Sequence, residues 1–132
     1  MGSVSGVDRL LADDRQVLRR VDAERARQIL HDGGLLIDIR PAAQRAAFGE
    51  VPGALIVERN DLEWRLDPRG SHRLPEADDA DRTAVIMCQE GYASSLAAAS
   101  LIRLGRPHTT DLDGGFAAWK AAGLPTLPPA TS

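Results

Sequence analysis

The centre of the chain reads Thr83-Ala84-Val85-Ile86-Met87-Cys88-Gln89-Glu90-Gly91-Tyr92-Ala93-Ser94. The first five residues of this stretch form a short apolar run, which is typical of a buried parallel strand. Residues 95–104 have the composition of a helix, which Ser94 or Ser95 can cap and Gly105 can end. The pattern therefore predicts a strand, a tight turn and a helix. It places Cys88 at the carboxyl end of the strand, where open α/β sheets bind their ligands.

The same alternation continues on both sides of this stretch. Short apolar or mixed runs predict further strands, and capping residues with amphipathic spacing predict helices between them. The predicted strands cover 35–39, 54–57 and 108–112, and the predicted helices cover 23–31, 41–48, 60–66 and a last segment that follows Asp113-Gly114-Gly115. Strands that alternate with helices predict an α/β domain whose parallel sheet is covered by helices on both faces.

Length and composition predict one globular domain. The chain has 132 residues, of which 43% are hydrophobic and 27% are charged. An amphipathic pattern from Val7 to Val21 predicts a helical extension over residues 1–20, ahead of a domain over 21–126. Prolines and small residues in 127–132 predict a flexible tail.

Charge and cysteine content narrow the expected partners and location. The net charge of −3 gives no general attraction to nucleic acid or to anionic lipid, and no apolar stretch approaches the length of a membrane span. A single cysteine cannot form an internal disulfide, which predicts a reducing compartment and by default the cytoplasm. The three histidines share no ligand spacing, so we expect no metal site and no cofactor.

Cys88 has two interpretations, a buried structural cysteine or a nucleophile. The residues after it favour the second. Gly91 permits the positive φ of a tight turn whose N–H groups point inward, and small residues let the next helix begin close to the sulfur. Backbone N–H groups and a helix N-terminus favour negative charge, and therefore the thiolate. Such a loop can hold a thiolate, a persulfide anion or a bound oxyanion.

Four segments of the chain together resemble the rhodanese-like sulfurtransferase domains. Each segment is a weak signal, but their order and spacing match over about residues 21–126. They are Leu35-Leu36-Ile37-Asp38-Ile39-Arg40, Gly49-Glu50-Val51-Pro52-Gly53-Ala54 with Glu50 in place of the usual His, Cys88 with the five residues after it, and Asp113-Gly114-Gly115-Phe116-Ala117-Ala118-Trp119-Lys120-Ala121-Ala122-Gly123-Leu124-Pro125.

The resemblance implies a three-layer fold with five parallel strands and helices on both faces. It also implies that Cys88 takes a sulfane sulfur from a donor, thiosulfate or a persulfide, and passes it to a thiol or to cyanide. An acceptor protein is one form that the thiol can take. Two alternatives remain: a persulfide carrier or sensor with slow turnover, and a catalytically silent module for protein interaction.

The predicted loop departs from the family at its charged positions. Active thiosulfate sulfurtransferases of this family often carry a cation just after the cysteine and near the end of the loop, where this chain has Gln89 and Ala93. Glu90 adds a negative charge, so we expect thiosulfate to be a poor donor. Related phosphatases use a loop that is one residue longer and ends in Arg, whereas this chain has Ser94.

The candidate site therefore consists of Cys88 as the catalytic residue, the loop after it and a set of supporting residues. Asp38 and Arg40 end a predicted strand beside the expected crevice, and a structural ion pair or a helix cap is favoured over a direct catalytic role. We expect the segment after the second strand to form either a cationic rim around Cys88 or a surface of paired charges. The loop consists of Gln89, Glu90, Gly91, Tyr92, Ala93 and Ser94, and the supporting residues are Asp38, Arg40, Arg59, Trp64 and Arg65.

Overall fold

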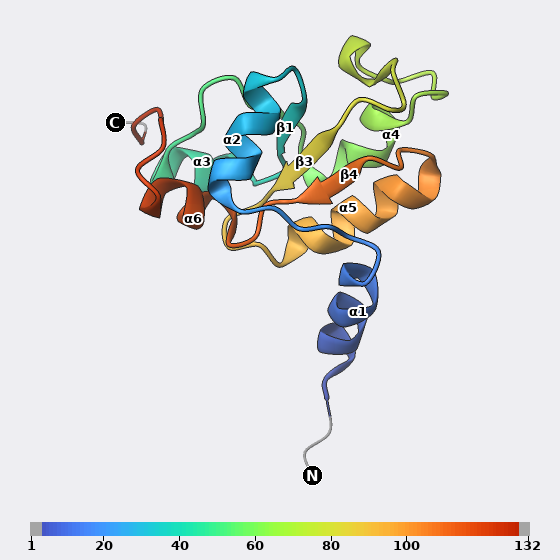
Figure 1. Cartoon of the computed structure of the whole chain (residues 1–132), viewed down its shortest axis with the longest axis horizontal. Helices are drawn as coiled ribbons and strands as arrows, with labels where there is room; N and C mark the ends of the chain where they lie inside the picture. The colour runs from blue at the N-terminus through green and yellow to red at the C-terminus, as the bar shows by residue number, and fades with distance from the viewer. Residues whose placement is uncertain (1–3, 130–132) are drawn as a thin grey trace.

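The computed structural model describes residues 4–129 and shows a sheet between two layers of helices (Figure 1). The sheet is parallel throughout, in the order β2-β1-β3-β4. This confirms the predicted α/β class. The strands are β1 (Leu35–Asp38), β2 (Leu55–Ile56), β3 (Ala84–Met87) and β4 (Thr109–Asp111).

The described residues form four strands, whereas the resemblance implied five. At the β4 edge of the sheet, Val21 makes a single parallel bridge to Leu112. Asp22 follows at once and caps α2 (Ala23–His31), because its side chain accepts the N–H of Arg25 at 2.8 Å. The helix cap therefore ends the extended conformation after one residue, before a ladder can form.

Alternation along β3 sorts its side chains between two cores. Val85 and Met87 pack on one face, in the cluster that includes Phe116 of α6 (Gly115–Ala121) and residues of α2. Ile86 and Cys88 pack on the other face, which α4 (Leu62–Leu66) and α5 (Ala93–Leu104) cover (Figure 1). Cys88 thus emerges from the sheet on the α5 side.

The remaining elements connect these layers. α3 (Ala42–Phe48) joins β1 to β2, as the proline at its start predicted. The segment after β2 forms a 3₁₀ turn, η1 (Arg59–Asp61), that runs into α4, and the predicted loop contains a second 3₁₀ turn, η2 (Pro75–Ala77). None of the helices within residues 4–129 has the length and apolar character needed to cross a membrane.

The predicted N-terminal extension forms α1 (Gly6–Arg15), which lies against α5 and projects from the body of the domain (Figure 1). None of its residues is buried. At the other end, Leu127 exchanges two backbone hydrogen bonds with Glu50. Residues 1–3 of the predicted extension and 130–132 of the predicted tail lie outside the described residues.

The start of α5 differs from the prediction. Ser94 and Ser95 were expected to cap it, but the helix begins at Ala93 and its N-cap, Tyr92, makes no side-chain cap. Both serines lie inside the first turn and are fully buried. Their hydroxyls donate to Asp111 of β4 at 2.7 Å each, so they bind a buried carboxylate instead of capping the helix.

The start of α6 lies against the turn that follows β3. The N–H groups of Phe116 and Ala117 donate to the carbonyls of Cys88 and Gln89, at 2.8 and 3.0 Å. Gly115 has a φ of +61°, and a Cβ at this position would overlap the carbonyl oxygen of Cys88. The glycine is therefore needed both for its conformation and for the close approach of the two segments.

We expect Gly115→Ala to destabilise the protein more than Gly123→Ala does. Gly123 has a φ of +74° but open space around it, so the alanine costs only backbone strain, about 1–2 kcal/mol. At Gly115 the overlap with backbone adds about 1–3 kcal/mol. Urea unfolding of the two variants measures the difference, and equal midpoints would contradict the close approach.

Candidate functional site

Cys88 directly follows β3, and its sulfur lies within a turn of backbone N–H groups. Sγ accepts the N–H of Gly91 at 3.1 Å and that of Ser94 at 3.3 Å. The side chain is nearly buried, with 7% of its surface exposed. Two inward N–H groups stabilise negative charge on sulfur. The arrangement suits a thiolate or a persulfide anion.

Gly91 makes this turn possible, because its φ is +90°. A Cβ here would also meet the backbone nitrogen of Gly114, in the turn before α6. Glu90, Tyr92 and Ala93 are exposed around the turn. The side chain of Glu90 is therefore accessible to solvent.

A buried carboxylate supports the far side of the turn. Asp111 is fully buried and accepts the hydroxyls of Ser94 and Ser95. Arg20 donates to both of its oxygens, at 2.9 and 3.2 Å, and also to the carbonyl of Gly91 at 2.8 Å. Arg15 donates to the same carbonyl at 2.8 Å. The turn is thus held from outside by side chains of β4, α5 and the N-terminal extension.

Asp38 and Arg40 form a buried ion pair at the end of β1. The guanidinium donates to both carboxylate oxygens, with a shortest distance of 2.8 Å, and both side chains are almost fully buried. Arg40 also donates to the side chain of Gln89 at 3.0 Å and lies 4.2 Å from the ring centre of Phe116. This supports the structural ion pair favoured from sequence, and it adds a contact to the loop.

A pocket of about 380 Å³ opens over Cys88, and Arg59 lines it. The guanidinium of Arg59 pairs with Glu63 at 2.8 Å. Burial would raise the pKa of Glu63, but hydrogen bonds from Ser100 and Arg59 outweigh it and lower the pKa below its usual value. Arg59 is therefore the residue of the predicted rim that the structure brings to the cysteine. Besides loop residues, the pocket over Cys88 is lined by Ile39, Arg40, Pro41 and Gln44.

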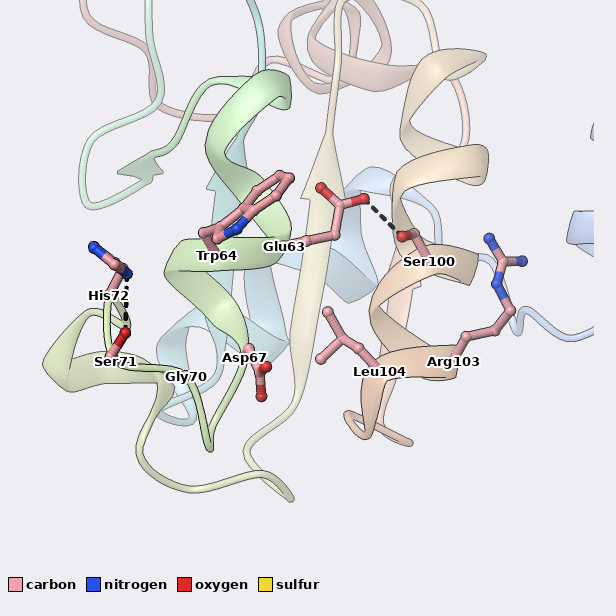
Figure 2. A pocket seen from close by; sticks show the side chains of 9 residues that line it. All are labelled: Glu63, Trp64, Asp67, Gly70, Ser71, His72, Ser100, Arg103 and Leu104. Carbon is pink, nitrogen blue, oxygen red and sulfur yellow. Dashed lines mark hydrogen bonds between the residues drawn. The ribbon is translucent and has the colours of Figure 1, made fainter.

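The other two rim residues lie elsewhere. Trp64 is 63% exposed and lines a separate pocket of about 520 Å³ between α4 and α5 (Figure 2). Arg65 donates to the carbonyl of His72, in the loop after α4. Of the three residues proposed for a rim, Arg59 lines the pocket over Cys88, whereas Trp64 and Arg65 lie away from it, because successive residues of a short helix point in different directions. The larger pocket has no contact with the sulfur.

Sequence reasoning missed the residues that hold the turn from outside, namely Arg15, Arg20, Ser95 and Asp111. One signal was present. A strand predicted over 108–112 contained Asp111, and a carboxylate in a buried strand needs hydrogen-bonded partners. The identity of the partners could not be read, because Arg20 lies 91 residues away in the sequence.

A family model of rhodanese-like domains matches residues 22–122, which is most of the chain. The chain belongs to the rhodanese-like family. Its relatives include a sulfurtransferase from Allochromatium vinosum, 35% identical over 115 residues, which make up 86% of this chain and 98% of the relative. A thiosulfate sulfurtransferase GlpE from Pseudomonas paraeruginosa is 30% identical over 103 residues, 78% of this chain and 84% of the relative.

A solved structure shares this fold over nearly the whole chain. A protein of unknown function from Rhodopseudomonas palustris, described as a possible tyrosine phosphatase, superimposes with a TM-score of 0.84 at 26% identity. The match covers 96% of this chain and 97% of that protein. The similarity therefore extends over nearly the whole length of both chains.

We expect Asp38→Asn to destabilise the protein by about 3 kcal/mol or more, because it leaves the guanidinium of Arg40 buried without its counter-charge. Asp78→Asn is the matched control. Asp78 pairs with Arg73 on the surface, where both side chains are exposed, so its loss should cost under about 1 kcal/mol. Urea unfolding compares the two variants. Similar decreases in the free energy of unfolding would show that the buried pair contributes no more to stability than the exposed one.

Proposed function

We propose that this rhodanese-like sulfurtransferase carries sulfane sulfur as a persulfide on Cys88. The sulfurtransferase activity rests on family membership and on relatives that are named sulfurtransferases. The observation that carries the role of Cys88 is the pair of backbone N–H groups that donate to its sulfur. They support the anionic sulfur before the reaction, and they can support the anion of the persulfide after it.

The proposed reaction needs two displacements on sulfur. The Cys88 thiolate attacks the outer sulfur of the donor, a new S–S bond forms, and the donor leaves with the electron pair of the broken bond. For thiosulfate this leaving group is sulfite. An acceptor thiolate then attacks the outer sulfur of the persulfide and takes it, so Cys88 returns as a thiolate; cyanide as acceptor gives thiocyanate. Neither displacement requires a metal or a redox partner.

Charge around the pocket limits the donor. Residues 88–94 contain no Lys or Arg, and the side chain of Gln89 already accepts a hydrogen bond from Arg40. Arg59 is the cation that lines the pocket with a partly exposed side chain, whereas Arg40 is buried. A dianion such as thiosulfate therefore meets little compensating charge, and we infer that a persulfide donor, with a single charge, is favoured.

The proposal includes the setting of the reaction. The substrates are a small sulfur donor and a thiol acceptor, which includes an acceptor protein, and no nucleic acid takes part. The reaction takes place in the cytoplasm, where a lone thiol stays reduced. The unit that carries it is the domain over 21–126, with the helical extension before it.

A phosphatase is the second candidate, since a similar solved structure carries that description. Transfer of a phosphoryl group requires cations on its equatorial oxygens. The loop of this chain ends in Ser94 where related phosphatases have Arg, so a phosphate would meet the N–H groups without a guanidinium. Hydrolysis of para-nitrophenyl phosphate that depends on Cys88 would favour the phosphatase over the sulfurtransferase.

We expect incubation with a sulfur donor to increase the mass of the protein by one sulfur atom, and Cys88→Ser to abolish the increase. The substitution removes the nucleophile, while its small size should keep the fold. Intact mass spectrometry with thiosulfate and with a low-molecular-weight persulfide tests both donors. No added sulfur with either donor would favour the silent interaction module.

We expect Arg59→Ala to slow persulfide formation by about two- to fivefold, the range of a partly exposed charge pair. Arg65→Ala is the matched control, because Arg65 has a similar side chain but bonds the carbonyl of His72 away from the pocket. Added salt should slow the parent protein toward the rate of Arg59→Ala. Equal rates for the parent and Arg59→Ala would remove Arg59 from the site.

A further inference from the structure

Two guanidinium groups bind one carbonyl at the back of the Cys88 turn. Arg15 at the end of α1 and Arg20 after it each donate to the carbonyl oxygen of Gly91 at 2.8 Å. The N–H of the same residue donates to Sγ of Cys88 at 3.1 Å. The carbonyl and the N–H of Gly91 belong to two peptide planes that meet at its Cα, so anchoring the carbonyl restricts how far the residue can rotate and helps to keep its N–H on the sulfur.

The second donor to the sulfur is anchored by the same group of side chains. Ser94 donates its backbone N–H to Sγ and its hydroxyl to the buried carboxylate of Asp111. Arg20 donates to that carboxylate through two nitrogens, and Arg15 donates to the hydroxyl of Ser95, which in turn binds Asp111. Both N–H groups that face Cys88 are thus tied to Arg15 and Arg20.

The charge of Arg20 also reaches the sulfur. Burial would lower the pKa of Arg20, but the hydrogen bond and charge of Asp111 raise it above its usual value, and the charges of Asp113 and of a Cys88 thiolate add to the increase.

We propose that Arg15 and Arg20 are positioning residues, which hold the turn with its N–H groups on the sulfur and so favour the Cys88 thiolate. Both residues precede 22–122, the part of the chain that the family model matches. The N-terminal extension is therefore part of the reactive site of this chain, and α1 is held on α5 beside the turn that it supports (Figure 1). The consequence for sulfur transfer rests on the proposed function, whereas the consequence for the thiolate does not.

The experiment measures the rate at which iodoacetamide alkylates Cys88 as a function of pH. Because Cys88 is the only cysteine, the rate reports on this thiol alone. The other charged and titratable groups around the turn stay unchanged in every variant: Arg40, Arg59, Glu90, Tyr92, Asp111 and Asp113. A change in the midpoint therefore belongs to the substituted arginine.

Arg15→Met is the decisive variant, and Arg15→Lys tests its charge. We expect the alkylation midpoint of Arg15→Met to rise by about one pH unit, and Arg15→Lys to recover part of that shift. Arg20→Met should raise the midpoint further. It also leaves Asp111 buried without its cation, so a loss of fold is an expected risk for that variant, and Arg15→Met decides the question independently.

Arg103→Met is the matched control, because Arg103 on α5 contacts Asp14 of α1 at 3.6 Å without touching the turn. It should keep the parent midpoint. An unchanged midpoint in Arg15→Met, or an equal shift in Arg103→Met, would overturn the proposal.

Sulfur loading of the same variants separates this inference from the proposed function. A shifted midpoint with slower loading in Arg15→Met supports both. A shifted midpoint in Arg15→Met, together with a parent protein that loads no sulfur, would keep the positioning role and reject the transferase mechanism.

Discussion

The carboxylate of Asp111 is fully buried at the end of β4, and a buried charge is tolerated only where other groups compensate for it. The compensating groups are Arg20 and the hydroxyls of Ser94 and Ser95. These contacts bring the N-terminal extension and the first turn of α5 to one point at the sheet edge. Because Ser94 also donates its N–H to the sulfur of Cys88, the geometry around this sulfur depends on the carboxylate.

A second buried ion pair holds the opposite side of the same turn. Arg40, paired with Asp38, donates to the side chain of Gln89, the residue directly after the cysteine. The turn is therefore supported by Arg40 on one side and Arg20 on the other. Arg20 is committed to a carboxylate and to a backbone carbonyl of the turn, whereas Arg40 is committed to a carboxylate and to the side chain of Gln89. This explains how a loop without cations can still keep its N–H groups aimed at a sulfur anion.

Arg59 differs from the arginines that support the turn, and this difference bears on the choice of substrate. Arg59 is partly exposed and pairs with Glu63, whose carboxylate is also held by Ser100. An exposed pair can exchange partners at little cost, since it is worth under about 1 kcal/mol. The pocket over Cys88 thus has a cradle for one negative charge and one adaptable cation at its wall. Under the proposed function, this charge balance favours a sulfur donor with one negative charge over a dianion.

Local patterns in the sequence determined the α/β class, the position of Cys88 after β3 and the need for glycine in the turn, because apolar runs, helix caps and positive φ values depend on neighbouring residues. They also predicted the Asp38–Arg40 pair, whose partners are two residues apart. Tertiary structure decided the rest. Among the residues that the structure describes, Val21 makes a single bridge and no fifth strand forms. Ser94 and Ser95 bind Asp111 instead of capping the helix. The tertiary structure also brought Arg15 and Arg20 to a carbonyl more than 70 residues away. These outcomes depend on which buried charge finds which partner across the chain, and no local pattern encodes that choice.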